Sequence, residues 1–255
     1  MLKAFLLSAG LGTRLRPLTD EIPKCLLPIV EKPLLQIWLE LLSKHDVDEV
    51  LINTHWHHGK VEEYLKSRKN TVGRKQGAKK GGPKIRLFYE QDLLGSAGTI
   101  LANRDWVADD EPFFILYGDN LTDVNLTKML SFHRQHGLPF TLGLFRTKKP
   151  KECGIAEIGS DNVVNTFVEK PDKPTSDFAA AGVYIADPSV FDFFPEKKET
   201  APAPLDLGHH IIPQLAGNMK AYFIPEFLMD IGTPESYQKA QALWKTQIKP
   251  RCTPD

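Results

Sequence analysis

The chain of 255 residues is long enough to bury a sizeable core as one large domain. Its 42% hydrophobic and 25% charged residues are typical of a globular protein and exclude a disordered or fibrous one. Lysine plus arginine and aspartate plus glutamate both number 32, so no overall charge favours a nucleic acid or an anionic membrane as a partner.

The cysteine pattern and the hydropathy indicate the cellular compartment. Cys25, Cys153 and Cys252 form no C-x-x-C pair, which favours reduced thiols over a disulfide framework. No apolar stretch approaches the roughly 18–20 residues that span a bilayer. We therefore expect a cytoplasmic protein with no membrane contact.

The first half of the chain alternates apolar, strand-like runs with segments of helical periodicity. Strands are expected at residues 4–9, 49–53, 84–89 and 113–117. Helices are expected at residues 33–45, 60–68, 96–103 and 125–136. Because parallel strands need long crossover connections, this order predicts a mostly parallel sheet with helices on both faces.

The second half is richer in β-structure. Strands are expected at residues 140–146, 154–158, 163–169, 179–186 and 219–223, with a hairpin turn at 160–162. Helices are expected at residues 206–216 and 234–245. Thr233 before Pro234 is a suitable N-cap for the second of these helices. No internal repeat is found, which excludes a β-helical extension.

Residues 67–84 differ in composition from the rest of the chain. The segment holds seven lysine or arginine residues, four glycines and no acidic residue. This composition predicts a mobile surface loop. No aromatic residue lies between the cations, so the segment lacks the stacking platform with which proteins hold single-stranded nucleic acids.

A glycine-rich segment, Ser8-Ala9-Gly10-Leu11-Gly12-Thr13-Arg14, follows the first predicted strand. Glycines let backbone N–H groups approach phosphate oxygens, because no Cβ stands in the way. The segment is not a P-loop, and Leu15 occupies the position of the third glycine in a dinucleotide fingerprint. Two cations, Arg14 and Lys24, follow closely, and such charges neutralise a triphosphate and a departing pyrophosphate.

The pattern G-x-G-T-R-L-x-P-L-T at residues 10–19, followed by P-K-x-L-L-P-I at residues 23–29, resembles the signature of the sugar-phosphate nucleotidyltransferases. The resemblance covers about residues 1–245 and implies an α/β fold. That fold is a Rossmann-like three-layer α/β/α sandwich with a mostly parallel central sheet and a small β-rich sugar-binding part. The implied reaction joins a nucleoside triphosphate and a sugar 1-phosphate into an NDP-sugar and pyrophosphate.

The same resemblance implies how the chain is organised. One nucleotidyltransferase domain would cover residues 1–247, and residues 248–255 would form a tail. Within the domain, residues 1–138 would bind the nucleotide and residues 139–247 the sugar. The relatives often assemble, so a homo-oligomer is compatible with the resemblance, although no interface can be identified in the sequence.

The resemblance assigns catalytic roles to Arg14, Lys24 and Asp119, and Mg²⁺ binding to Asp119 and Asp230. Asp119 follows an apolar strand, at the position where open α/β sheets bind their ligands. Asp230 begins Asp230-Ile231-Gly232-Thr233-Pro234, which is similar to the family's D-x-G-T-P segment. Two carboxylates from opposite halves of the chain suit a hard cation that keeps most of its waters.

The resemblance also implies which residues bind the substrates. The implied nucleotide-binding residues are Ala9, Gly10, Gly12, Thr13, Arg14, Gln91, Gly95, Ser96 and Ala97. The implied sugar-phosphate-binding residues are Glu169, Lys170 and Gly182, since Glu169-Lys170-Pro171 resembles the family's E-K-P motif. The G-S-A-G sequence at residues 95–98 is most similar to mannose-1-phosphate guanylyltransferases, which favours GTP and mannose 1-phosphate. Ala180 stands where the family often has an asparagine, and this leaves the identity of the sugar open.

Other interpretations remain for these patterns. Taken alone, Asp119 could belong to a turn, Glu169 to a solvated ion pair and Asp230 to a loop. The histidines at 55–58 and 209–210 are interpreted as structural, because adjacent histidines on a helix point in different directions. Alternative functions are a UTP- or dTTP-dependent glucose-1-phosphate enzyme, a cytidylyltransferase for a phospho-alcohol, or a non-catalytic NDP-sugar-binding regulatory subunit.

Overall fold

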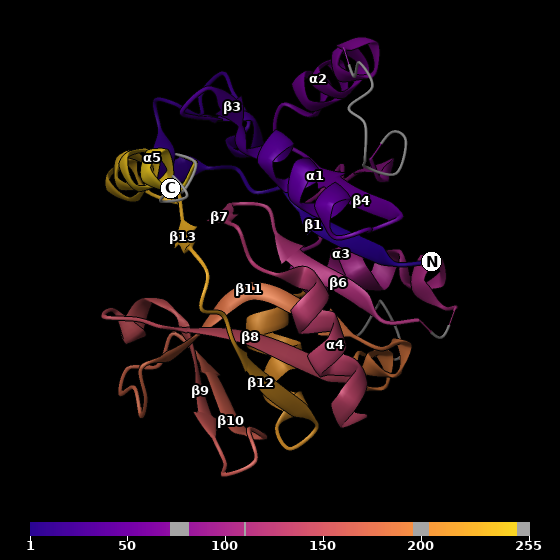
Figure 1. Ribbon diagram of the computed structural model, residues 1–255, viewed down its shortest axis with the longest axis vertical. Coiled ribbons are helices and arrows are strands. Elements are labelled where there is room, and N and C mark those ends of the chain that lie inside the picture. The colour runs from indigo at the N-terminus through magenta and orange to yellow at the C-terminus, as the bar shows by residue number, and fades with distance from the viewer. Residues whose placement is uncertain (72–81, 110, 196–203, 249–255) are drawn as a thin grey trace, which may run out of the picture.

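The protein is described by a computed structural model that places residues 1–71, 82–109, 111–195 and 204–248. In these residues nine strands form one sheet (Figure 1). Their bounds are β1 Lys3–Leu7, β4 Glu49–Thr54, β5 Lys84–Tyr89, β6 Phe113–Tyr117, β8 Phe140–Arg146, β9 Gly154–Ile158, β10 Val164–Glu169, β11 Phe178–Ala186 and β12 Met219–Phe223. The sheet is mixed, and its central strands are mostly parallel, as predicted.

The centre of the sheet is parallel. Strand β1 lies between β4 and β6, and β5 pairs with the outer side of β4, all in parallel. In this register Leu7 pairs with both Asn53 and Tyr117. The carboxyl ends of β1, β4 and β6 therefore meet at one edge, and the loops that leave them enclose a common space.

Strand β11 joins the two halves of the chain. Its second half pairs antiparallel with β6, its first half pairs with β9 of the β9–β10 hairpin, and β8 runs along its other side. The pairing with β8 shifts between Ala180 and Tyr184, where Gly182 has a φ of +64°. This irregularity lets one strand serve both the main sheet and the β-rich part.

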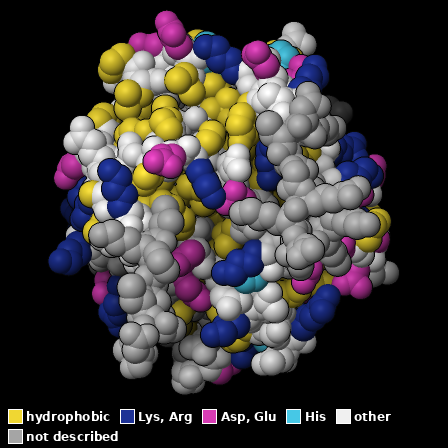
Figure 2. All heavy atoms as spheres, turned by 45° about the horizontal axis from the view of Figure 1, so that its top comes forward, with side chains coloured by type: hydrophobic (Ala, Val, Ile, Leu, Met, Phe, Trp, Pro, Cys, Tyr) yellow, Lys and Arg dark blue, Asp and Glu magenta, His cyan; other side chains and the backbone are white. Residues whose placement is uncertain are grey.

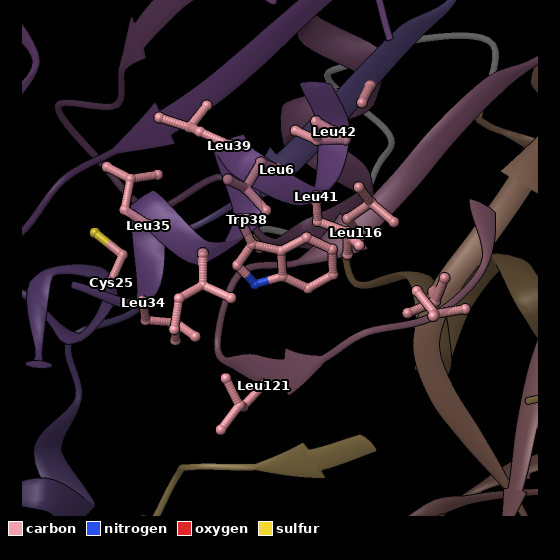
Figure 3. Close-up of a cluster of buried hydrophobic side chains, with 14 of the residues drawn as sticks. Leu6, Cys25, Leu34, Leu35, Trp38, Leu39, Leu41, Leu42, Leu116 and Leu121 are labelled. Atoms are coloured by element: carbon pink, nitrogen blue, oxygen red, sulfur yellow. The ribbon is translucent and has the colours of Figure 1, made fainter. Parts of the chain in front are cut away.

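Helices cover both faces of the sheet (Figure 1). Their bounds are α1 Leu34–Lys44, α2 His58–Thr71, α3 Ser96–Ala102, α4 Leu126–His136 and α5 Pro234–Ile248. Alternate strand residues point to opposite faces, so Leu6 belongs to the core that α1, α2, α4 and α5 cover, whereas Phe5 belongs to the core on the side of α3. Figure 3 shows Trp38 of α1 among leucine side chains of the core that contains Leu6. Trp38 is 1% exposed there.

Most predicted elements agree with the structure, and β6, β8, β9 and β12 have the predicted bounds. Thr233 caps α5 as expected, since its Oγ1 accepts a hydrogen bond from the N–H of Ser236 at 3.1 Å. The helix predicted at residues 206–216 is present at Leu207–Leu215, but it is not an α-helix. A π-helical turn, η7 (Leu207–Ile211), is followed by a 3-10 turn, η8 (Ile212–Leu215), because Pro213 has no N–H to continue an α-helix.

The predicted basic loop at 67–84 is partly wrong as well. Helix α2 continues to Thr71 and β5 begins at Lys84, so both ends of the segment belong to regular elements. Residues 72–81 lie outside the described residues. Four short strands were not predicted: β2 Pro28–Ile29, β3 Lys32–Pro33, β7 Asn120–Thr122 and β13 Leu228–Asp230. No helix of the described residues combines the length and the apolarity needed to cross a membrane.

Candidate active site

The glycine loop that follows β1 curls back on itself. Gly12 has a φ of +65°, and Thr19 Oγ1 donates a hydrogen bond to its carbonyl oxygen at 2.7 Å. A 3-10 turn, η1 (Thr13–Leu15), then buries Leu15 and leaves Arg14 exposed. A Cβ on Gly10 would have no protein atom within 4 Å. The space above Gly10 is therefore open.

Side chains from the β4–α2 connection hold the far end of this loop. Trp56 Nε1 donates to the carbonyl oxygen of Thr19 at 3.0 Å, and His57 Nε2 lies 2.8 Å from that of Asp20. His55 Nδ1 lies 2.8 Å from the carbonyl oxygen of Glu90. Since a carbonyl can only accept, each of these imidazole nitrogens is a donor, and both rings tie loops together.

Lys24 and Asp119 form a direct ion pair. Lys24 begins a 3-10 turn, η2 (Lys24–Leu26), and its Nζ donates to Asp119 Oδ2 at 2.8 Å. The exposed fractions of the two side chains are 11% and 33%. An ammonium group that is shielded to this extent interacts with an anion more strongly than one in bulk water.

Asp230 is brought beside Asp119 by the pairing of β13 with β7, in which Asp230 lies opposite Asn120. The N–H of Ile231 donates to the carbonyl oxygen of Asp119 at 3.1 Å, which fixes this register. Burial and the negative charge of Asp119 raise the pKa of the Asp230 carboxyl, while Lys24 and Arg14 act in the opposite direction. A Cβ on Gly232 would lie 2.5 Å from Asp230 Oδ1 and 2.9 Å from a terminal nitrogen of Arg14. Two carboxylates and two cations thus meet at one point.

A cavity of about 330 Å³ opens beside this cluster. Six of the predicted site residues line it: Ala9, Gly10, Lys24, Gly95, Ser96 and Asp119. Gly12, Thr13, Arg14, Gln91 and Ala97 do not line it. Ala97 is completely buried, and the N–H groups of Ala97 and Gly98 both donate to the carbonyl oxygen of Leu205 at 3.0 Å.

A buried polar network, which the sequence interpretation missed, supports the floor of the cavity. Glu90 is 3% exposed, and its Oε1 accepts hydrogen bonds from Asn53 Nδ2 at 2.8 Å and from Thr99 Oγ1 at 2.5 Å. Asn53 Oδ1 in turn accepts from the N–H of Ser8 at 2.6 Å. Asn53 and Glu90 both line the cavity. Their position at the carboxyl ends of parallel strands was the signal that could have identified them.

Glu169 lies where two glycines leave room for its carboxylate. A Cβ on Gly154 would lie 2.5 Å from Glu169 Oε2, and a Cβ on Gly208 would lie 2.6 Å from the same atom. Burial raises the pKa of Glu169, and the charge of Asp206 adds to this effect. Lys170 Nζ lies 4.0 Å from Glu169 Oε1 and is largely exposed. Lys170 also has a φ of +49°, a strained backbone conformation of the kind that collects at functional sites.

An amide does lie beside Gly182, although Ala180 cannot supply it. Asn120 Nδ2 donates to the carbonyl oxygen of Ala181 at 2.9 Å. A Cβ on Gly182 would come within 2.5 Å of the same nitrogen, so only glycine fits here. Gly182 is therefore explained by the packing of Asn120 against the bend of β11.

The surface around the glycine loop is mixed in character. Leu11, Leu18 and Ile22 of this loop are each between 38% and 43% exposed. Figure 2 shows hydrophobic side chains gathered on the upper part of the molecule and charges of both signs below them. This distribution agrees with the equal numbers of acidic and basic residues in the chain.

The fold and the site together define an α/β protein whose candidate site combines a glycine loop, two cations and two carboxylates. The chain belongs to the nucleotidyl transferase family, whose sequence profile matches residues 3–247. It is 31% identical over 251 residues to the catalytic subunit beta of mannose-1-phosphate guanylyltransferase from Dictyostelium discoideum, covering 97% of this chain and 66% of that protein. The corresponding protein of Danio rerio is 30% identical over 252 residues, with the same coverage. The chain thus spans slightly less than two thirds of the length of these relatives.

Solved structures share the fold. A UDP-glucose pyrophosphorylase in complex with UDP-glucose superposes with a TM-score of 0.78 at 23% identity, covering 97% of this chain and 99% of that one. HddC from Yersinia pseudotuberculosis superposes with a TM-score of 0.76 at 22% identity, covering 96% and 100%. At these identities the likeness establishes the architecture alone.

Proposed function

We propose that the protein is a sugar-1-phosphate nucleotidyltransferase, which forms an NDP-sugar and pyrophosphate and uses residues 1–247 as one catalytic unit. The observation that carries this proposal is the meeting of Lys24 and Arg14 with Asp119 and Asp230 beside an open cavity. A protein that only bound a nucleotide sugar would gain nothing from holding two mutually repelling carboxylates side by side.

The residues present fit a bound Mg²⁺. Asp119 and Asp230 offer hard oxygen ligands, and the raised pKa of Asp230 indicates a shortage of positive charge at that carboxylate. No group of three or more His, Cys, Asp or Glu among the described residues forms a closed metal site. A cation with only two protein carboxylates suits Mg²⁺, which completes its shell with water and substrate phosphate. When bound, this ion would neutralise the charge on the phosphates.

The reaction needs no base from the protein. A phosphate oxygen of the sugar 1-phosphate, already anionic, attacks the α-phosphorus, forming one O–P bond while the bond to pyrophosphate breaks. Lys24 and Arg14 stabilise the negative charge that spreads over the phosphates. The backbone N–H groups of Gly10 and Gly12 donate no hydrogen bond within the described residues. Both are therefore free to donate hydrogen bonds to phosphate oxygens. The chain therefore acts by positioning the substrates and by neutralising charge.

We further propose GTP and mannose 1-phosphate as substrates. The names of the relatives support this choice. A UTP- or dTTP-dependent enzyme, a phospho-alcohol cytidylyltransferase and a regulatory subunit are the alternatives. We place the protein in the cytoplasm, in agreement with the free thiols of Cys25 and Cys153. Homo-oligomer formation stays a prediction, which light scattering can test.

The test is pyrophosphate release with Mg²⁺. Purified protein is supplied with each of GTP, UTP, dTTP, CTP and ATP against mannose, glucose, amino-sugar and heptose 1-phosphates. Rapid release with GTP and mannose 1-phosphate, well above every other pair, is the expected result. Preference for a different pair would correct the substrates but keep the reaction. Silence from folded, Mg²⁺-supplied protein across the whole grid would contradict the reaction itself.

A further inference from the structure

A third carboxylate, Asp206, lines the cavity beside those of Glu90 and Asp119, and it lies close to Glu169 across Gly208. It immediately precedes η7 and comes from a segment that the sequence interpretation expected to be an ordinary helix. The side chain is half-buried and faces the same space as Ser96 and Tyr117. No role has been assigned to it so far.

The contacts of Asp206 hold it in place without neutralising it. Its Oδ2 accepts a hydrogen bond from Ser96 Oγ at 2.9 Å, and its Oδ1 accepts from the N–H of His209 at 3.0 Å. Ser96 Oγ accepts from the N–H of Leu207 at 2.8 Å, which fixes the direction of the Ser96 hydroxyl. Within the described residues no lysine or arginine forms an ion pair with Asp206. Because each carboxylate oxygen has two lone pairs, each one retains the capacity to accept another hydrogen bond.

Gly208 lets the carboxylates of Asp206 and Glu169 approach the backbone of η7 closely. A Cβ on Gly208 would lie 2.6 Å from Glu169 Oε2 and 3.3 Å from Asp206 Oδ1, so both carboxylates pack against the same glycine. Neighbouring acceptors of the same charge are best satisfied by a ligand that donates hydrogen bonds. A phosphate group only accepts, whereas the hydroxyl groups of a pyranose donate.

We propose that Asp206 binds the sugar directly and that it selects, together with Glu169, a sugar 1-phosphate with free hydroxyl groups on neighbouring carbons. This inference rests on the proposed function and adds a specificity-determining residue to it. Ser96 is then a positioning residue, whose hydroxyl orients the Asp206 carboxylate. A deoxy analogue lacks the sugar hydroxyl that donates a hydrogen bond to Asp206. The half-buried carboxylate would then have no partner on that side, so the enzyme should disfavour this analogue.

The experiment combines protein variants with altered substrates. Wild type, Asp206→Asn and the control Asp105→Asn, whose side chain is fully exposed, are assayed with the preferred sugar 1-phosphate and its monodeoxy analogues. We expect wild type and Asp105→Asn to lose about 10- to 100-fold in kcat/KM on one analogue. With the full sugar, the kcat/KM of Asp206→Asn should be lower than that of wild type by a similar factor. Changing from the full sugar to that analogue should lower the kcat/KM of Asp206→Asn only slightly further. The KM for the nucleoside triphosphate should change less than about twofold.

Other outcomes overturn the inference. Equal losses for Asp206→Asn on all sugars would indicate a merely structural side chain, and a raised KM for the nucleoside triphosphate would place Asp206 on the nucleotide. Asparagine retains the cap of η7, and unfolding temperatures check this. If the variant does not fold, Gly208→Ala replaces it, because its Cβ would displace Glu169 and crowd Asp206, and it should raise the KM for the sugar 1-phosphate alone. An inactive wild type across the substrate grid contradicts the proposed function, whereas an active one with indifferent variants contradicts only this inference.

Discussion

Lys24 and Asp119 lie 95 positions apart in the sequence, yet the Lys24 ammonium is 2.8 Å from Asp119 Oδ2. Asp230 reaches the same point from the opposite end of the chain through the β7–β13 pairing. The site is therefore an assembly of three distant segments around the carboxyl end of β6. Each of the following predictions tests one part of this assembly.

Removing the Lys24 ammonium should abolish most turnover without unfolding the protein. We expect Lys24→Ala to lower kcat by about 10²–10³-fold, because the cation that stabilises the departing phosphate charge is lost. Pyrophosphate release and thermal unfolding are measured together. The control is Lys32→Ala, since Lys32 Nζ lies 2.8 Å from Glu40 Oε2 in an ion pair of equal length that is largely exposed. Near-normal turnover of Lys24→Ala would refute its assigned role.

Replacing Asp230 should separate stability from activity. Burial and the charge of Asp119 raise the pKa of Asp230, so at neutral pH the folded protein carries a charge that it disfavours. We expect Asp230→Asn to lose activity and to unfold at a higher temperature than wild type. Added Mg²⁺ should raise the unfolding temperature of wild type and not that of the variant. A variant that is less stable and still responds to Mg²⁺ would contradict both the strain and the metal role.

Gly10→Ala tests whether the triphosphate lies against the backbone of the glycine loop at Gly10. A Cβ at Gly10 meets no protein atom within 4 Å, so the folded state should tolerate it and the unfolding temperature should not fall. The same methyl group would occupy space that we assign to the triphosphate, and kcat/KM for the nucleotide should fall about 10- to 100-fold. Gly59→Ala is the matched control, because a Cβ there is equally unobstructed but lies on α2. Equal activity of the two variants would place the triphosphate elsewhere.

A histidine chain at the end of α4 should make the fold sensitive to acid. His136 Nδ1 accepts from the N–H of Leu138 at 3.0 Å, and His136 Nε2 lies 2.7 Å from Thr141 Oγ1. His133 Nδ1 lies 2.8 Å from the same oxygen. Burial and the neighbouring His133 lower the pKa of His136 to about 4. The neutral His136 ring is thus required as both acceptor and donor.

The sign of the pH effect follows from this lowered pKa. Between the unfolded value of 6.5 and the folded value of about 4, the unfolded chain binds more protons, so stability falls as pH falls. For one group the slope is less than about 1.4 kcal/mol per pH unit. Urea unfolding at several pH values should show a shallower decline in this window for His136→Gln than for wild type. An unchanged pH profile would remove His136 as a cause.

Much of the architecture could be predicted from the sequence. The buried strands β6 and β8 and the amphipathic helix α1 depend on local hydrophobic periodicity, which is written directly in the chain. The glycine loop could be recognised for a similar reason. Gly10, Gly12 and Arg14 lie within five residues, so their spacing needs no tertiary information.

What the sequence by itself determined was therefore each run whose structure depends on neighbours a few positions away, together with the family motifs. Only the tertiary structure decided the rest. Strands β7 and β13 have three residues each and exist because they pair with each other, which carries Asp230 to Asp119. Glu90 and Asp206 are ordinary acidic residues until the packing of distant segments buries one and aims the other into the cavity. Desolvation and proximity of charge arise from contacts across the fold, and no local pattern in the chain encodes them.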